Sequence, residues 1–380
     1  MRISLILILS LASLPIFASE RIDFKARIFI DGDYLGPYYQ KDSDENTDYR
    51  AHVELASLKS TLKYKLTSNL QTKLQIEYKK ESEEDYKDKF QIDDFYLKYD
   101  INDTSSLRFG QFKEPMGHER LMGSSSLPAI ERSIVTNAFA PGRNPGIAYE
   151  FGNQSTSFHI GYFKIADDDF KNGIATTLRS TYGGSIGDHL FHIGASISNR
   201  DFDDSSFQIK ERGEVNSADN IIRSARYNSN GQNIFQGELG WLINDIWIMS
   251  EYYQTEVQQT AADKWQYQGF YFQFSSLLNF SKIIKKDNYQ YKNGEFDKRK
   301  AKAGDIEWVI RYSGLSLRDL NYSKSEEIGA VASSVLLGLN YRLRKNISVM
   351  SDILFPDISG NVVNTNQEGY ALSFRLKYEI

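Results

Sequence analysis

The sequence predicts an all-β fold, a transmembrane antiparallel β-barrel of about sixteen strands, and three observations support that fold class. Apolar and polar residues alternate with a period of two from about Phe24 to the last residue, as in strands that separate lipid from water. Tyr, Phe and Trp number 24, 23 and 4 and make 13% of the chain, which suits aromatic girdles at both bilayer interfaces. The chain also begins with a segment typical of exported proteins.

That N-terminal segment has the features of a cleaved secretory signal. Arg2 precedes an apolar run over residues 3–17, and Ala18 stands where signal peptidase requires a small residue. The run is shorter than the roughly 20 apolar residues of a transmembrane helix. We therefore expect residues 1–18 to be a signal peptide and residues 19–380 to form one barrel domain in the bacterial outer membrane.

Composition excludes several other classes of protein. Charged residues interrupt every later apolar run and the mean hydropathy is -0.48, so a helical membrane protein is excluded. The net charge of -5 becomes -6 once Arg2 is removed, with 44 basic against 50 acidic residues, which argues against nucleic-acid binding. Cysteine is absent, so closure of a large sheet must provide the stability that disulfides give many exported proteins.

The clearest strand is the last one. Six apolar residues at alternate positions predict its lipid-facing side: Tyr370, Leu372, Phe374, Leu376, Tyr378 and Ile380. Ala371, Ser373, Arg375, Lys377 and Glu379 fall between them and predict a polar, inward side. Similar stripes follow Leu70 to Tyr78 and Val335 to Leu343.

Short polar turns alternate with longer charged connections along the chain, as they do in outer-membrane barrels. Six short turns are predicted at residues 67–69, 102–104, 152–154, 187–188, 244–245 and 344–346, and a longer one at 276–303. Seven turns and eight loops imply sixteen strands. A barrel of that width leaves an aqueous channel, which favours a role in transport.

The most distinctive segment reads GQFKEPMG from Gly110, followed by ERS from Glu131 and NAFAPGRN from Asn137. Together these motifs resemble the phosphate-selective porin O and P family, and weaker similarities extend over nearly the whole chain beyond the signal. The resemblance implies a homotrimeric porin whose third long loop, here residues 113–144, folds into the lumen as a constriction. Its mixed charges and its Gly and Pro residues suit that role.

The resemblance also implies an anion site of basic side chains, since guanidinium groups offer fixed paired donors to phosphate. The positions that match the central site are Arg27, Arg50, Arg120 and Asp93. Lys113, Arg132 and Arg143 are further basic residues of the third loop, and Lys210 and Arg212 fall where the family has an arginine ladder.

Two features weaken the expected preference for phosphate. Ala51 replaces the second residue of an arginine pair in the family. Glu211 and Glu214 interrupt the ladder around Lys210 and Arg212. We therefore predict a water-filled channel for small anions or other small hydrophilic solutes, with weak anion preference. We expect no cofactor and no nucleic acid, and contacts with outer-membrane lipid and lipopolysaccharide.

Two other classes of function stay open from the sequence. Some outer-membrane barrels are hydrolases, but none of the five His residues stands beside a recognisable nucleophile motif, so we expect no enzymatic activity. An adhesin or structural barrel without an open lumen is the other alternative. Conductance measurements separate it from a porin. The charged residues named above also have a plainer interpretation, namely that they wet the lumen and the loop surfaces.

Overall fold

The computed structural model describes residues 21–39, 49–80, 88–166, 172–260, 264–278, 289–296, 302–319, 329–360 and 369–380. The predicted signal peptide lies outside the described residues. None of the helices in these ranges is long and apolar enough to cross a membrane.

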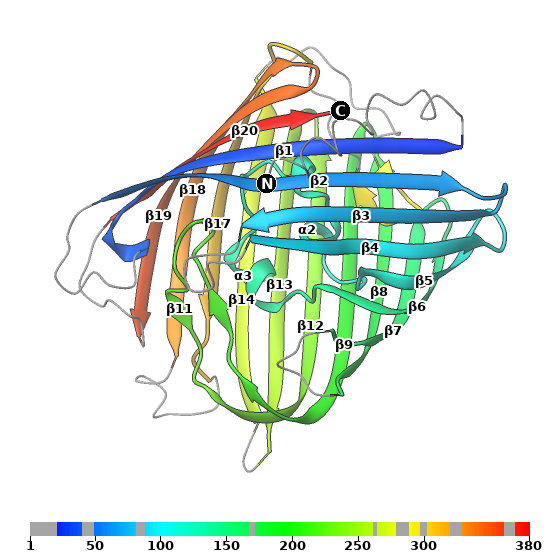
Figure 1. Ribbon diagram of the computed structural model, residues 1–380, viewed down its shortest axis with the longest axis horizontal. Helices are drawn as coiled ribbons and strands as arrows, with labels where there is room; N and C mark the ends of the chain where they lie inside the picture. The colour runs from blue at the N-terminus through cyan, green and yellow to red at the C-terminus, as the bar shows by residue number, and fades with distance from the viewer. Residues whose placement is uncertain are drawn as a thin grey trace.

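Sixteen antiparallel strands form one closed barrel, in which each strand pairs with the next and β1 pairs with β20 (Figure 1). The barrel strands are β1 (Ile22–Leu35), β2 (Arg50–Lys65), β3 (Leu70–Lys80), β4 (Asp88–Asp100), β5 (Ser105–Lys113), β6 (Arg143–Gly152), β7 (Thr156–Lys164), β8 (Ile174–Ile186), β9 (His189–Phe207), β12 (Tyr227–Ile243), β13 (Ile246–Gln259), β14 (Lys264–Leu277), β17 (Ile306–Ser316), β18 (Ala330–Arg344), β19 (Ile347–Gly360) and β20 (Ala371–Glu379). The predicted fold class and strand number are confirmed.

Alternation along the strands separates the two faces of the barrel wall, as the sequence predicts. On β20, Phe374 and Leu376 leave 46% and 44% of their surface exposed on the outer face. Arg375 and Lys377, which point inward, are only 3% and 7% exposed. Because successive side chains of a strand point to opposite faces, one strand can meet lipid on one side and the lumen on the other.

The predicted turns all fall between consecutive barrel strands, and side-chain hydrogen bonds close several of them. The Oδ1 atom of Asn102 accepts hydrogen bonds from the backbone N–H groups of Thr104 (2.9 Å) and Ser105 (2.8 Å). Asn153 makes the same kind of turn between β6 and β7. Asparagine is common in turns because its side chain can satisfy backbone donors in this way.

The connection between β14 and β17 is longer, and it contains a small hairpin of β15 (Tyr289–Gln290) and β16 (Glu295–Phe296). This β15–β16 hairpin lies within the barrel rather than at its rim, because its residues contact inward-facing side chains of β8, β9 and β13. The sequence predicts a longer turn here but not its inward position.

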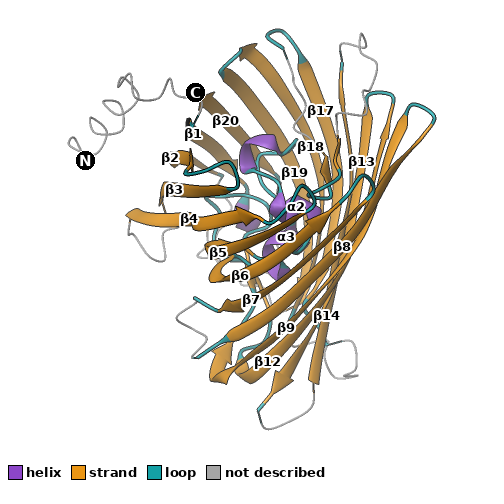
Figure 2. Cartoon of the chain, turned by 90° about the vertical axis from the view of Figure 1, so that its right-hand side faces the viewer, coloured by secondary structure: helices purple, strands orange, loops and turns teal. Residues whose placement is uncertain are grey.

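The third loop also lies inside the barrel (Figure 2). It contains α2 (His118–Leu121), η4 (Ser124–Ser126) and α3 (Ile134–Phe139), and α3 contacts β13, β14 and β17. The fifth loop, residues 208–226, carries β10 (Lys210–Glu211) and β11 (Ile222–Arg223) and contacts α3. One further short helix, η2 (Pro37–Tyr39), follows β1.

Buried charge pairs fix the third loop to one side of the wall. Arg311 of β17 is 1% exposed, and its guanidinium group lies 3.1 Å from Glu119 of α2 and 2.9 Å from Glu214 of the fifth loop. Gly117 adopts φ 70°, and a Cβ there would lie 2.0 Å from the hydroxyl of Tyr253, so only glycine fits this close approach. The third loop therefore packs firmly against β13, β14 and β17 on this side of the barrel.

Candidate functional site

A polar cavity of about 640 Å³ lies between the third loop and the inner wall formed by β1–β6 and β20. Its charged lining is strongly basic. The basic residues are Arg27, Lys59, Lys63, Lys73, Lys79, Arg108, Lys113, Arg120, Arg132, Arg143 and Arg375. The acidic residues are Glu77, Asp94, Glu131 and Glu295. Eleven cationic groups against four anionic groups give this cavity the opposite sign to the whole chain, whose net charge is -5.

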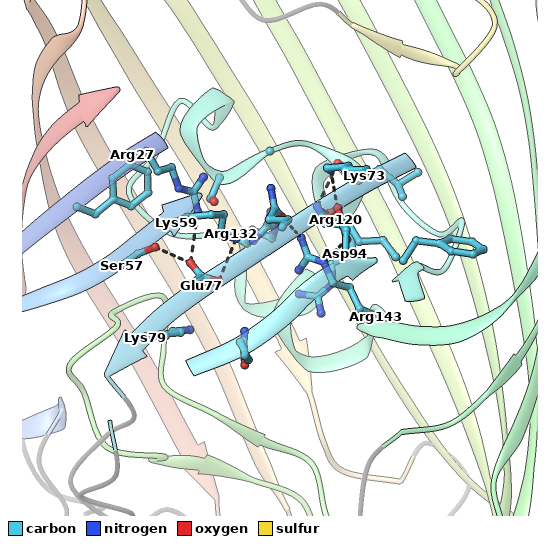
Figure 3. Close-up of a pocket in the computed structure, with 18 of the residues that line it drawn as sticks. Arg27, Ser57, Lys59, Lys73, Glu77, Lys79, Asp94, Arg120, Arg132 and Arg143 are labelled. Carbon is cyan, nitrogen blue, oxygen red and sulfur yellow. Dashed lines mark hydrogen bonds and ion pairs between the residues drawn. The ribbon is translucent and has the colours of Figure 1, made fainter. Parts of the chain in front are cut away.

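On the strand side, several of the basic residues are paired with carboxylates. Lys59 of β2 lies 2.9 Å from Glu77 of β3 and donates a short hydrogen bond to Asp93 of β4. Arg27 of β1 lies 3.5 Å from the same Glu77 (Figure 3). Their positions follow from the alternation, which places these charged side chains on inward faces of adjacent strands. The charges of Lys59 and Arg27 are therefore largely neutralised.

A second ion-pair group lies beside the first. The Nε atom of Arg143 donates to Asp94 over 2.6 Å, and Lys73 donates to the other oxygen of that carboxylate over 2.5 Å. Arg143 also bonds Gln75 over 3.2 Å. These contacts tie the end of the third loop to β3 and β4, and they hold Asp94 between two cations.

Three cations of the third loop instead bind neutral backbone oxygens. Lys113 Nζ donates to the carbonyls of Arg120, Leu121 and Met122 over 2.6, 3.1 and 3.0 Å, at the end of α2. The last carbonyls of a helix have no partner within the helix and form the negative end of its dipole. A cation there is therefore favoured both by hydrogen bonding and by electrostatic attraction. Arg132 also donates to the carbonyl of Met122, over 2.8 Å.

Arg120 completes this group, which we call the loop triad (Lys113, Arg120 and Arg132). Its Nε atom donates to the carbonyl of Pro141 over 2.9 Å. No ion pair between described residues includes any of the three. Burial, together with the nearby guanidinium groups of Arg132 and Arg143, lowers the pKa of Arg120 to about 9. The group stays charged at neutral pH, and an anion in the cavity would supply the missing negative charge.

The structure brings together five of the nine predicted site residues. Arg27, Lys113, Arg120, Arg132 and Arg143 all line the cavity, and Figure 3 labels Arg27, Arg120, Arg132 and Arg143.

The other four predicted residues do not line the cavity. Asp93 is not among the lining residues, but it binds Lys59 and lies 3.5 Å from Arg143, both of which line the cavity. Arg50 lies at the far end of β2. Lys210 and Arg212 lie on the fifth loop, and Arg212 donates to the carbonyl of Asn216 over 3.0 Å.

Sequence reasoning missed most of the cavity wall. Lys73, Glu77 and Lys79 fall on the polar side of an alternating strand, so the pattern indicates that they face inward but not that they meet the third loop. Glu295 comes from the β15–β16 hairpin, and no pattern in the sequence indicates that it reaches the lumen. Within the described ranges, no group of three or more His, Cys, Asp or Glu residues could hold a metal ion.

Comparison with known proteins gives one family and a set of similar barrels. A family model described as phosphate-selective porin O and P matches residues 24–380. None of the curated proteins matches the sequence. An anion-selective porin from Comamonas acidovorans is 10% identical with a TM-score of 0.56, and the match covers 94% of this chain and 99% of that chain.

Two other solved structures are similar to the same degree. Salmonella typhi OmpF has 12% identity and a TM-score of 0.58, and the outer membrane channel DcaP of Acinetobacter baumannii has 11% and 0.57. Each match covers 94% of this chain and 97% of the other. At these identities the similarity establishes the barrel fold.

Proposed function

The chain belongs to the phosphate-selective porin O and P family, and from this premise we propose that it is a weakly anion-selective channel whose selectivity region is the basic cavity. As an outer-membrane porin, it lets small hydrophilic solutes diffuse passively through a water-filled lumen. The observation that carries the anion preference is the excess of basic over acidic side chains around this cavity. The few charges at the narrowest point of a channel outweigh the net charge of the whole surface, because low-dielectric walls focus the field there.

The loop triad is the part of the cavity best suited to attract anions. Arg120 and Arg132 bind only neutral oxygens among the described residues, so their charge is available to a passing ion. Guanidinium groups keep that charge at any physiological pH. The wall opposite contributes less, because Glu77 and Asp94 neutralise the neighbouring cations.

The same arrangement supports a weak preference rather than a dedicated phosphate site. A cavity of about 640 Å³ is much larger than an inorganic anion, so it does not enclose a single ion closely. Ala51 stands where the family has an arginine, and Arg50 lies at the far end of β2. We therefore propose little discrimination between phosphate and chloride.

The assembly and location that we propose rest on the sequence and on the family. Residues 1–18 act as a signal peptide, and the mature barrel assembles as a homotrimer in the outer membrane. Its apolar outer stripes contact lipid and its exposed loops contact lipopolysaccharide. Membership of a porin family supports a channel without enzymatic activity. Light scattering in detergent tests the trimer, because a monomer mass would contradict it.

Planar-bilayer electrophysiology tests the channel. In a KCl gradient, the zero-current potential should have the sign of a chloride preference. Replacing KCl by potassium phosphate should change the permeability ratio by little. A cation preference, or a block of chloride current by low phosphate concentrations, would contradict this account of the site.

A further inference from the structure

We propose that Glu295, which the β15–β16 hairpin brings into the basic cavity, is a specificity-determining residue that limits the anion preference of the channel. The inference rests on the proposed function, because it assigns a role within the same ion pathway. It concerns a segment far from the third loop in the sequence, and none of the motifs discussed above includes it.

The hairpin is held inside the barrel by buried polar contacts. Arg179 of β8 donates from Nη1 to the carbonyl of Asn293 (3.0 Å) and from Nη2 to the carbonyl of Gly294 (2.8 Å). Its Nη2 atom also lies 2.6 Å from Glu238, and both of these side chains are fully buried. A buried guanidinium group with its charge paired and its remaining donors satisfied gives a rigid anchor.

The residues on both sides of Glu295 are fixed as well. The backbone N–H of Phe296 donates to Nε2 of His118 in α2 over 3.1 Å, which joins the hairpin directly to the third loop. Gly294 adopts φ 63°, and a Cβ there would lie 2.2 Å from the hydroxyl oxygen of Thr181. Glycine is therefore required at this close approach. The contacts of Gly294 and Phe296 fix the backbone on both sides of Glu295.

Aromatic packing supports the same position. The ring of Phe296 lies 5.7 Å from those of both His118 and Trp247. Tyr289, across the hairpin from Phe296, forms a 2.5 Å hydrogen bond with His192. These groups are buried, so the hairpin is part of the packed interior of the barrel.

Glu295 differs from the other acidic residues that line the cavity. Glu77, Asp94 and Glu131 each lie within 3 Å of a cation, at 2.9 Å from Lys59, 2.6 Å from Arg143 and 2.8 Å from Arg375 respectively. Among the described residues, no ion pair includes Glu295.

The charges that surround Glu295 agree with this placement. Burial raises the pKa of Glu295, whereas the positive charges of Arg179, Lys113 and Arg108 act in the opposite direction. Lys113 and Arg108 line the same cavity. A carboxylate that faces these cations without a close partner reduces the positive potential that an entering anion meets. It also attracts cations to the same degree, so both effects lower the anion-to-cation permeability ratio.

Glu295→Gln tests the role, because it removes the charge and keeps the size and polarity of the side chain. Zero-current potentials are measured in a KCl gradient at pH 8, to favour the ionised form of the carboxyl group in the wild type. We expect the anion-to-cation permeability ratio to rise about 4-fold, for one charge removed about 6 Å from the ion at moderate salt. Glu295→Lys should raise it further.

A matched control separates a local from a general charge effect. Asp188 lies on the exposed turn between β8 and β9 and does not line the cavity, so Asp188→Asn makes the same change in net charge and should leave the ratio unchanged. Heat-dependent migration on detergent gels verifies that each variant is a folded barrel. An unchanged ratio in folded Glu295→Gln and Glu295→Lys, or an equal rise in Asp188→Asn, would overturn the inference.

The outcomes also separate this inference from the proposed function. The sign of the wild-type potential tests the anion preference, whereas the difference between wild type and Glu295→Gln tests the hairpin residue. A cation-selective wild type whose potential still shifts toward anions in Glu295→Gln contradicts the proposed function and supports the role of Glu295.

Discussion

Reversing the charge of Arg120 is expected to turn a weak anion preference into a cation preference. Arg120 belongs to the loop triad, and no carboxylate among the described residues pairs with it. Removing the positive charge of Arg120 should therefore change the potential that permeating ions experience, and should not leave a carboxylate without its cation. Arg120→Glu changes the charge at that point by two units, and Arg120→Gln changes it by one while keeping a donor for the carbonyl of Pro141.

The size of the cavity sets the magnitude. A sphere with the cavity's volume of 640 Å³ has a radius of about 5 Å, so a central ion lies about 6 Å from the guanidinium group. With the dielectric constant of water, one unit charge at that distance contributes about 0.7 kcal/mol, and screening at 0.1 M salt leaves about 0.4 kcal/mol. The water value is a lower limit, because the low-dielectric wall increases the interaction.

Each unit of charge acts on anions and cations in opposite directions. Arg120→Gln should therefore lower the anion-to-cation permeability ratio by about 0.8 kcal/mol, or about 4-fold, and Arg120→Glu by about 15-fold. A weakly anion-selective channel should then invert the sign of its zero-current potential in Arg120→Glu.

Arg344→Glu is the control for this experiment. Arg344 lies exposed at the end of β18, outside the cavity, so the same charge reversal there should have little effect. If Arg120→Glu folds normally and its potential equals that of wild type, the reasoning about the loop triad is wrong.

Three further predictions concern the interior of the barrel. Gly294→Ala should displace the β15–β16 hairpin and raise the anion preference as Glu295→Gln does; a wild-type zero-current potential in this variant would count against the docking argument. Arg311→Met should cost about 3–5 kcal/mol of stability, because Glu119 and Glu214 are left buried without their cation; urea unfolding in detergent measures the loss, and a change below about 1 kcal/mol would contradict the role of this pair. Burial and the nearby His192 hold the pKa of His118 well below 6.5, so the folded protein does not take up the proton that unfolded His118 binds below pH 6.5. The free energy of unfolding should therefore be highest above that pH and fall by up to about 1.4 kcal/mol per pH unit below it. His118→Gln should reduce this slope, and an unchanged slope in the variant would refute the prediction.

The fold could be predicted because a barrel wall imposes the same two-residue period on every strand. The C-terminal strand shows this most clearly, with Phe374 and Leu376 outside and Arg375 inside. The turns could be predicted for a local reason too, since Asn102 and Asn153 close theirs with their own side chains. Such signals lie within a few residues, so a single sequence contains them.

The candidate site was only partly predictable, because it depends on which strand positions lie at the height of the third loop. Arg50 and Lys59 are on the same strand, but nine residues of strand place them roughly 30 Å apart, and of the two only Lys59 lines the cavity. Matching a motif to the family identifies Arg120 within the loop. It does not give the depth of a wall residue such as Arg50.

Glu295 shows the other limit. Its position depends on contacts with Arg179 and His118, which are more than 100 residues away in the sequence. The hairpin strands are two residues each, too short for a periodic pattern. The position of such a segment can be inferred only from the three-dimensional structure, which shows the inward side chains of the barrel that bind it.

The most direct test of the central claim is the zero-current potential of the wild-type protein in a KCl gradient across a planar bilayer. The claim is that the basic cavity, and not the net charge of -5, decides which ions pass. A potential of the sign produced by chloride permeation, of modest size and little changed with phosphate as the anion, is the predicted result. A potential of the sign produced by potassium permeation would contradict the claim.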